Sequence, residues 1–201
     1  MQNTAANFTR DRYLIVRSLL NQSSLGRFYN YVCKAAETGT PNMVDLLVPD
    51  TPFAYGDFVT DGLMVSLLPR VEEFSGLSLF PTYSYCRTYK SGDVLPKHRD
   101  RRSCEISVSL CLGFEAKEPW PLWIEGPQGT SSIILSPGDA VLYRGIECWH
   151  WREAFEGRLQ AQLFMHYVEQ TGPNAEWKFD KREAVGDPPT QDHHSIANPP
   201  R

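Results

Sequence analysis

Residues 83–100 read YSYCRTYKSGDVLPKHRD, and this stretch decides the fold class of the chain. The side chains at 83, 85, 87 and 89 are large and alternate with Ser, Cys and Thr, which is the period of two typical of a β-strand. The run Ser91-Gly92-Asp93 then ends the alternation with residues that favour turns. We therefore predict a strand followed by a tight turn, with His98 and Asp100 on a further strand beyond it.

Strand-like segments continue along the rest of the chain. Further runs rich in apolar and β-branched residues are separated by Gly, Pro and Asp turns, at 106–114, 122–125, 132–135, 140–143 and 159–168. Strands at this spacing predict a sandwich or a barrel.

The N-terminal half carries helical signals instead. After a short strand at Tyr13–Val16, Ser23 and Ser24 are candidate N-caps of a helix that runs to about Ala36 and ends near Gly39 and Pro41. A second helix is expected from about Asp61, with Pro69 as a kink or interruption. The fold class that follows is mainly β with N-terminal helices (α+β), in which a jelly-roll core is backed by helices.

Length and composition fit one domain with a substantial core, because the chain has 201 residues of which 41% are hydrophobic. We assign this domain to residues 1–171, with its β core at about 78–168. Residues 172–201 form a polar, Pro-rich C-terminal tail that either packs little or folds over the body.

Cysteine use and charge limit the setting and the partners. The five cysteines are an odd number without a C-x-x-C pair, which argues against a disulfide framework or a zinc knuckle. The opening residues are polar and no long apolar run exists, so we expect a cytoplasmic protein that does not contact a membrane. The formal net charge of −4 makes nucleic acid an unlikely partner.

The residues that carry chemistry are His98 and Asp100, two positions apart, and His150 further along. Side chains at i and i+2 of a strand point the same way, so His98 and Asp100 can hold one ion, with His150 approaching from a neighbouring strand. Two imidazoles and a carboxylate on one face of a metal leave the other face open, as in non-haem Fe(II) sites, although zinc, nickel or cobalt fit the same ligands.

Residues 80–168 resemble the Fe(II)- and 2-oxoglutarate-dependent dioxygenases, in particular the group similar to prolyl hydroxylases. The resemblance rests on three segments in the family's order. These are 83–100 with its H-x-D motif, Ser136–Tyr143 as the turn and strand that usually precede the second histidine, and His150 with Arg158 eight residues later after Gly157.

The resemblance implies a double-stranded β-helix core, Fe(II) on His98, Asp100 and His150, and 2-oxoglutarate and O2 as cosubstrates. Arg158 is then the expected partner of the distal carboxylate of 2-oxoglutarate, since a guanidinium offers two parallel donors. Tyr89 is a second candidate for the cosubstrate, or else part of an aromatic ladder on the sheet.

Arg144 and Arg152 compete with Arg158 for this role. Strand parity favours Arg158, because it shares one face of its strand with Gln160, Gln162, Phe164 and His166. His166 is expected to be a hydrogen-bonded sheet histidine and not a fourth ligand.

A substrate pocket is expected beside the metal. Its candidate residues are Tyr83, Arg87, Arg102, Trp149 and Arg144, and a core role fits Trp149 equally well. Lys97, Arg99, Arg101 and Arg102 gather positive charge around the ligands, which either attracts an anionic substrate or is an ordinary solvated strand end.

The predicted function is therefore hydroxylation of a C–H bond in an amino acid, a peptidyl side chain or a small metabolite, with release of succinate and CO2. Asp100 favours hydroxylation, because halogenases of this family have a small residue at that position. The alternatives are a non-catalytic metal-binding jelly roll and a cupin-type dioxygenase that does not use 2-oxoglutarate. The sequence leaves the substrate and the oligomeric state open.

Overall fold

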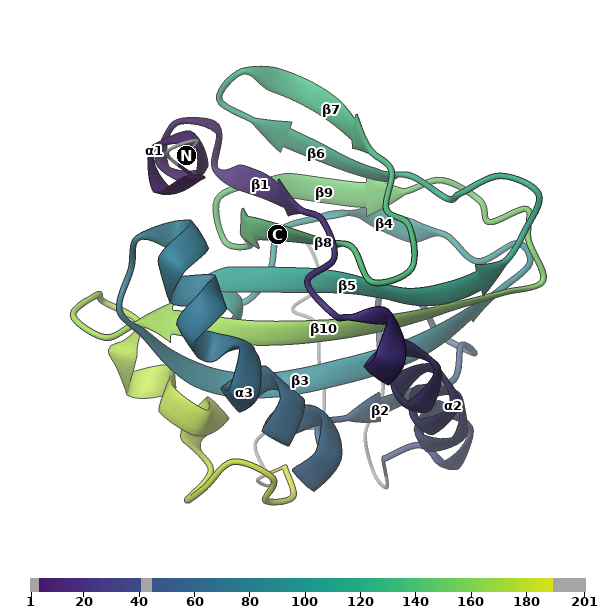
Figure 1. Cartoon of the computed structure of the whole chain (residues 1–201), viewed down its shortest axis with the longest axis horizontal. Helices are drawn as coiled ribbons and strands as arrows, with labels where there is room; N and C mark the ends of the chain where they lie inside the picture. Colours follow the sequence, from purple (N-terminus) through teal and green to yellow (C-terminus); the bar gives the residue numbers. More distant parts are fainter. Residues whose placement is uncertain (1–3, 41–44, 190–201) are drawn as a thin grey trace.

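The computed structural model describes residues 4–40 and 45–189. Two antiparallel sheets face each other, and helices cover the outer face of the larger one (Figure 1). The larger sheet has the strand order β1-β8-β5-β10-β3-β2, and the smaller sheet has the order β4-β9-β6-β7. This arrangement confirms the predicted jelly-roll core with N-terminal helices.

The strands of the larger sheet are long in the middle and short at the edges. Their bounds are β1 Tyr13–Val16, β2 Phe53–Tyr55, β3 Leu79–Lys90, β5 Ile106–Glu115, β8 Ala140–Arg144 and β10 Leu159–Glu169. The alternation seen at 83–89 thus lies inside β3, which pairs with β10 along almost its whole length.

The smaller sheet contains both histidines of the predicted metal site. It consists of β4 Leu95–His98, β6 Leu122–Gly126, β7 Gly129–Ile133 and β9 Trp149–Arg152. His98 of β4 and His150 of β9 are directly opposite each other in register. Alternation along β9 turns His150 and Arg152 inward, where both are 2% exposed, while Trp149 and Trp151 lie on the outer face.

The helices begin and end at residues with specific capping roles. Helix α2 (Gln22–Thr38) begins after Asn21, whose side chain accepts from the Ser24 backbone N–H, so the cap lies two residues before the predicted serines. It ends at Gly39 as predicted, whereas Pro41 lies outside the described residues. Helix α3 (Phe58–Ser75) begins at a capping box of Asp57 and Thr60, ahead of the expected Asp61, and continues through Pro69.

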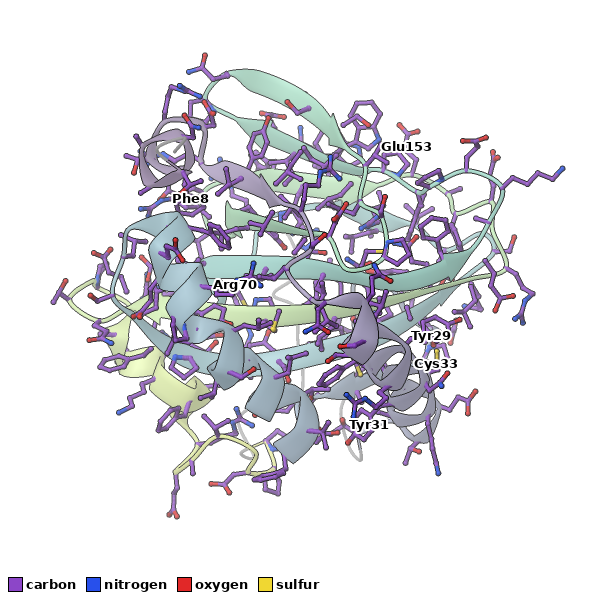
Figure 2. The ribbon with its side chains drawn as sticks, in the orientation of Figure 1. Phe8, Tyr29, Tyr31, Cys33, Arg70 and Glu153 are labelled. Carbon is purple, nitrogen blue, oxygen red and sulfur yellow. The ribbon has the colours of Figure 1, made fainter. Side chains whose placement is uncertain are left out.

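A hydrophobic core joins these helices to the larger sheet. Val32 of α2, Met64 and Val71 of α3 and Leu163 of β10 are almost fully buried in one cluster. Phe8 of α1 (Thr4–Asp11), a helix that the sequence analysis did not predict, joins the same cluster beside α3 (Figure 2). The apolar face of β10 is thus covered by helices, which leaves its other face for the space between the sheets.

The segment after β10 folds over the body of the domain. A 3₁₀ segment, η2 (Ala175–Lys181), contacts β3, and Arg182 then reaches Asp61 of α3 at 2.9 Å, with both side chains 0% exposed. Residues 172–189 therefore follow the second of the two expected behaviours of the tail, and residues 190–201 lie outside the described part. No helix among the described residues is long and apolar enough to cross a membrane.

We predict that Arg182→Met lowers the free energy of unfolding by about 3–5 kcal/mol, because removing one partner leaves the other charge buried and unpaired. Urea denaturation followed by circular dichroism measures this change. Lys181→Met is the matched control, since the neighbouring Lys181 is exposed and its contact with Glu176 at 3.5 Å is on the surface. Equal stability of the two variants would contradict the assigned role of the Arg182–Asp61 pair.

Candidate metal centre and its cavity

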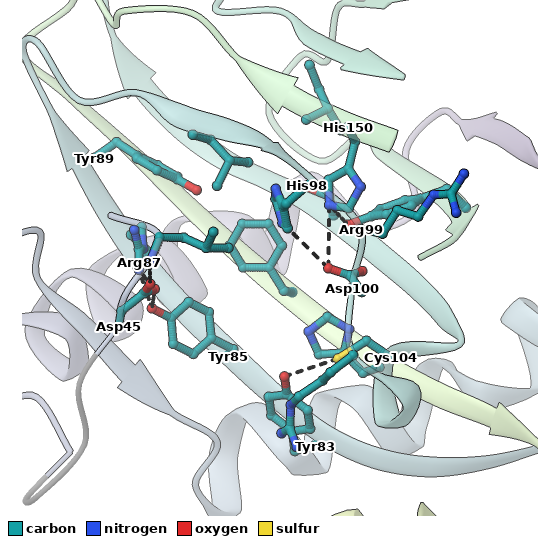
Figure 3. Close-up of a pocket in the computed structure, with 18 residues that line it drawn as sticks. Asp45, Tyr83, Tyr85, Arg87, Tyr89, His98, Arg99, Asp100, Cys104 and His150 are labelled. Atoms are coloured by element: carbon teal, nitrogen blue, oxygen red, sulfur yellow. Dashed lines mark hydrogen bonds and ion pairs between the residues drawn. The ribbon is translucent and has the colours of Figure 1, made fainter. Parts of the chain in front are cut away.

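Three side chains converge between the two sheets. One ligand atom each from His98, Asp100 and His150 lies within 4.8 Å of the others, which makes a group able to hold a metal ion (Figure 3). The strands bring the two histidines together, whereas Asp100 lies just beyond the end of β4. Its backbone N–H donates to the carbonyl of Gly145 at 2.9 Å, and this contact fixes the chain at Asp100.

Hydrogen bonds orient both imidazoles in the same way. Nδ1 of His98 lies 2.8 Å from the Pro96 carbonyl, and Nδ1 of His150 lies 3.1 Å from the Cys148 carbonyl. A carbonyl can only accept, so the network assigns the hydrogen to Nδ1 in each ring and leaves Nε2 with a free lone pair. The two Nε2 atoms lie 3.7 and 3.5 Å from Oδ1 of Asp100, so all three lone pairs face one small space.

The second oxygen of Asp100 is held by a short relay. Ser107 donates to Oδ2 of Asp100 at 2.8 Å, and the same hydroxyl lies 3.0 Å from Nδ1 of His166. A hydroxyl has one hydrogen, so Ser107 accepts from His166 while it donates to Asp100. His166 is thus a hydrogen-bonded sheet histidine, as predicted, and the relay orients Asp100 toward the ion.

The protonation states suit a metal. Burial, aided by the nearby His150, lowers the pKa of the His98 imidazole to about 4. Burial opposes the ionisation of Asp100, but the imidazoles of His150 and His98 outweigh it and hold the pKa of this carboxyl below its usual value. Near neutral pH a neutral His98 and an ionised Asp100 are therefore present, which are the forms that metal ions require.

The ligands open into a cavity of about 690 Å³, part of which is open to solvent. Aromatic side chains form much of its wall, and four aspartate or arginine side chains besides the ligand set lie along it, namely Asp45, Arg87, Arg99 and Arg101. Arg87 and Asp45 form a buried ion pair to which Tyr85 also contributes its hydroxyl (Figure 3).

The expected pocket residues divide into two groups. Tyr83, Arg87 and Tyr89 line the cavity. Trp149 and Arg102 do not. Trp149 lies on the outer face of the smaller sheet and Arg102 is exposed. Arg144 lies outside as well and pairs with Glu147 at 3.2 Å. The role of the first three in substrate or cosubstrate binding stays a prediction.

The expectation that Arg158 points into the cavity is contradicted by its position. Arg158 precedes the first residue of β10, its side chain is 72% exposed, and its Nε donates to Oε2 of Glu115 at 2.6 Å. The parity argument holds for Gln160, Gln162, Phe164 and His166, which are turned toward the space between the sheets. It fails for Arg158 at the very start of the strand: the backbone N–H still donates to the Glu115 carbonyl at 2.7 Å, but the side chain extends to the Glu115 carboxylate in solvent.

Several residues in and around the cavity have no signal in the sequence. Asp45 belongs to a loop between α2 and β2, and Asp180 belongs to the segment after β10 that reaches Arg101 at 2.7 Å. Gly145 makes room for the centre, since an added Cβ would lie 2.2 Å from Oδ2 of Asp100. Ser107 has no sequence signal either, because its position opposite His166 follows from how β5 and β10 pair in the sheet.

No family model matches the sequence, and a search of curated proteins also finds no match. Solved structures do match. The non-haem α-ketoglutarate-dependent epimerase SnoN from nogalamycin biosynthesis aligns over 96% of each chain with a TM-score of 0.67 at 12% identity. A prolyl-4-hydroxylase from Pseudomonas putida aligns over 83% of this chain and 97% of its own, with a TM-score of 0.63 at 15% identity.

A third match, HygX from Streptomyces hygroscopicus, was solved with nickel and 2-oxoglutarate bound. It aligns over 85% of this chain and 88% of its own, with a TM-score of 0.67 at 12% identity. The chain has the fold of the 2-oxoglutarate-dependent non-haem oxygenases. This finding confirms the fold that the sequence resemblance implied. A fold does not determine a reaction, so the chemistry of this chain depends on the side chains at its site.

We predict that Gly145→Ala weakens metal binding about 10–100-fold, the range typical when a group that orients a ligand is disturbed. The new methyl group would meet Asp100 Oδ2 and also lie 2.4 Å from the Cys104 carbonyl, so Asp100 has to move. Isothermal titration with Ni²⁺ or Co²⁺ measures the affinity. Gly26→Ala in α2 is the control, because nothing lies within 4 Å of its added Cβ. Unchanged affinity in Gly145→Ala would show that the close approach is not needed.

Proposed function

We propose that this protein is an Fe(II)- and 2-oxoglutarate-dependent oxygenase that hydroxylates a C–H bond of an amino acid, a peptidyl side chain or a small metabolite and releases succinate and CO2. The observation that carries the proposal is the convergence of His98, Asp100 and His150 within 4.8 Å at the wall of a cavity. The fold supports it, since the matched structures include enzymes described as α-ketoglutarate-dependent.

The ligand set fits Fe(II). Two imidazoles and one carboxylate on one side of an ion leave positions free on the cavity side. Bound iron would supply the activation of O2, with 2-oxoglutarate as the source of electrons. The protein holds the ligands in place through the Pro96 and Cys148 carbonyls and through Ser107, and it excludes water by burying the centre.

For the distal carboxylate of 2-oxoglutarate we propose Arg152 in place of Arg158. Arg152 lies two residues after His150 on the inner face of β9 and is 2% exposed. Its Nη1 donates to the Trp120 carbonyl, and among the described residues no carboxylate lies within 4.0 Å of its guanidinium. A buried cation without a counter-ion is costly, so an anionic ligand fits here.

The surroundings of Arg152 support this assignment. Burial lowers the pKa of the Arg152 guanidinium, which indicates that its neighbours compensate the charge poorly. Tyr89 lies next to it at the inner end of the cavity and points its hydroxyl into the cavity on the side of His98 (Figure 3). Arg87 is the weaker candidate for the cosubstrate, because it lies on β3, where Asp45 and the Tyr85 hydroxyl already engage its guanidinium, and not on the strand of His150.

The other side chains of the cavity would orient the substrate. Tyr83, Tyr85 and Phe164 form an aromatic wall near the ligands. Burial raises the pKa of both tyrosines well above the usual value, so they act as neutral surfaces and hydrogen-bond donors and not as bases. Their part is to position a C–H bond, since no proton transfer by a side chain is required of them.

The rival functions differ in what they require. A metal-binding jelly roll without turnover and a cupin-type dioxygenase both need the metal ligands, but neither needs a buried guanidinium without a counter-ion beyond them. Succinate release from 2-oxoglutarate in air, with Fe(II) and ascorbate, therefore separates the proposal from both. A screen of amino acids, short peptides and metabolites for a mass gain of one oxygen then identifies the substrate. Without succinate under any of these conditions the proposal fails.

We predict that Asp100→Ala abolishes succinate formation, because one of the three ligands is lost, and that Arg158→Ala leaves it unchanged, because Arg158 lies on the surface. Both variants are compared in the same assay after their melting curves have been matched. Full activity in Asp100→Ala would remove this residue from the ligand set.

We predict that Arg152→Met weakens the binding of 2-oxoglutarate by about tenfold to a hundredfold, as expected for the loss of hydrogen bonds between charged groups. Calorimetric titration of the Ni²⁺-loaded protein with 2-oxoglutarate measures it without turnover. Arg144→Met, which removes the same charge outside the cavity, should change little. A larger effect in Arg87→Met than in Arg152→Met would move the anchor to Arg87.

The cytoplasm is the proposed location. All five cysteines are free, and four of them are buried. Thiols in this state fit a reducing compartment.

A further inference from the structure

The part of the cavity next to the metal ligands combines aromatic rings with positively charged side chains. Aromatic rings of Tyr83 and Phe164 lie there together with two guanidinium groups, Arg99 and Arg101, which flank the ligand Asp100 in the sequence. Arg99 rests on the ring of Trp149 at 4.7 Å, is exposed, and has no carboxylate within 4.0 Å among the described residues. The opening of the cavity is thus positively charged, although the whole chain is acidic.

Arg101 is held in one position. Its Cζ lies 4.7 Å from the centre of the Tyr83 ring, which in turn stacks on Tyr55 at 4.8 Å, so the guanidinium rests on a stack of two rings. Its Nη2 donates to Oδ2 of Asp180 at 2.7 Å. Its Nε is buried and has no hydrogen-bond partner among the described residues. Because Arg101 also lines the cavity and its guanidinium has five N–H donors, it can bind an acceptor that the protein itself does not supply.

Asp180 reaches Arg101 through an unusual backbone. Phe179, Asp180 and Lys181 have φ values of 54°, 56° and 62°, in the left-handed region that non-glycine residues rarely adopt. Asp180 is 0% exposed, and the hydroxyl of Tyr55 also donates to it at 2.8 Å. Three successive residues in this region cost free energy, and such strain is typical of sites where a side chain has to be aimed.

The simpler reading is that the Arg101–Asp180 pair only fastens the C-terminal segment to the body. Arg182, two residues after Asp180, already performs that task, because it pairs with Asp61 and also donates to the carbonyls of Phe179, Thr82 and Asp187. A fastening role also leaves unexplained why Arg101 faces the cavity with Nε unused. The strained turn is better explained by the direction in which it holds Arg101.

We propose that the substrate carries an anionic group, a carboxylate or a phosphate, that binds Arg101 beside the metal centre, with Asp180 as the residue that positions Arg101. That the bound anion belongs to a substrate rests on the proposed function, whereas the presence of an anion site does not depend on turnover. Arg99 at the opening adds attraction for the same group. The aromatic wall favours an acid with an apolar or flat body over a bare inorganic ion.

Binding of three probes to the metal-free full-length protein tests the proposal. The probes are phenylacetate, phenyl phosphate and the neutral phenylacetamide, and saturation-transfer NMR titrations give their affinities. We expect at least one acid to bind about tenfold or more tightly than the amide, since a hydrogen bond between charged groups is stronger than a neutral one. The better of the two acids tells a carboxylate site from a phosphate site.

Variants of single residues show which side chain causes the preference for the acid over the amide. Arg101→Met should remove the preference for the acid, and Asp180→Asn should reduce it. Arg102→Met makes the same change of charge one residue further on, in an exposed side chain outside the cavity, and should leave it intact. The preference should also persist in Arg152→Met, which separates this site from that of the cosubstrate.

Equal binding of acids and amide to the wild-type protein would overturn the proposal, as would a preference that survives Arg101→Met. The comparison in the wild-type protein needs no variant, so it decides even if Arg101→Met fails to fold. Because no metal or turnover is involved, a missing preference and a missing release of succinate are separate failures. The first removes the anion site and the second removes the oxygenase.

Discussion

The carboxylate of Asp100 is the group on which the rest of the site depends. It lies beyond the end of its strand, where no sheet hydrogen bond holds it, and yet it has to meet two imidazoles from the smaller sheet. Three contacts keep it there: the Gly145 carbonyl on its backbone, Ser107 on Oδ2, and the attraction of the two histidines on Oδ1. Each contact comes from a different strand or turn, so the centre forms only when both sheets are assembled.

The positively charged side chains around the cavity differ in whether a carboxylate pairs with them. Of the four buried or cavity-lining guanidinium groups near the metal ligands in the described part of the chain, two are paired with a carboxylate and two are not. Arg87 has Asp45 and Arg101 has Asp180, whereas Arg99 and Arg152 have no such partner among the described residues. Arg99 is exposed at the cavity, whereas Arg152 is buried on the inner face of β9, two residues after His150. The proposed site for 2-oxoglutarate is the unmatched Arg152, and the proposed site for an anionic group of the substrate is Arg101, with the unmatched Arg99 at the opening adding attraction.

The fold could be anticipated because its signals are local. Alternation of large and small side chains follows from the geometry of each strand, and the turns follow from Gly, Pro and Asp, so most strands were placed to within a few residues. The misjudged helix starts have a local cause too. Asn21 and Asp57 cap their helices as well as serine does, so residue type alone does not tell these caps from the neighbouring candidates.

The sequence by itself determined the ligand set, because the spacing of His98 and Asp100 and the resemblance around His150 are properties of the chain order. Tertiary structure alone decided which arginine faces inward. Arg158 and Arg152 are both close to His150 in sequence, and only the limits of the paired strands put one in solvent and the other between the sheets. The places of Asp45 at the cavity, Gly145 beside Asp100 and Asp180 beside Arg101 also follow only from the tertiary structure, because they join segments far apart in the chain, and burial and pairing energies depend on that distant packing.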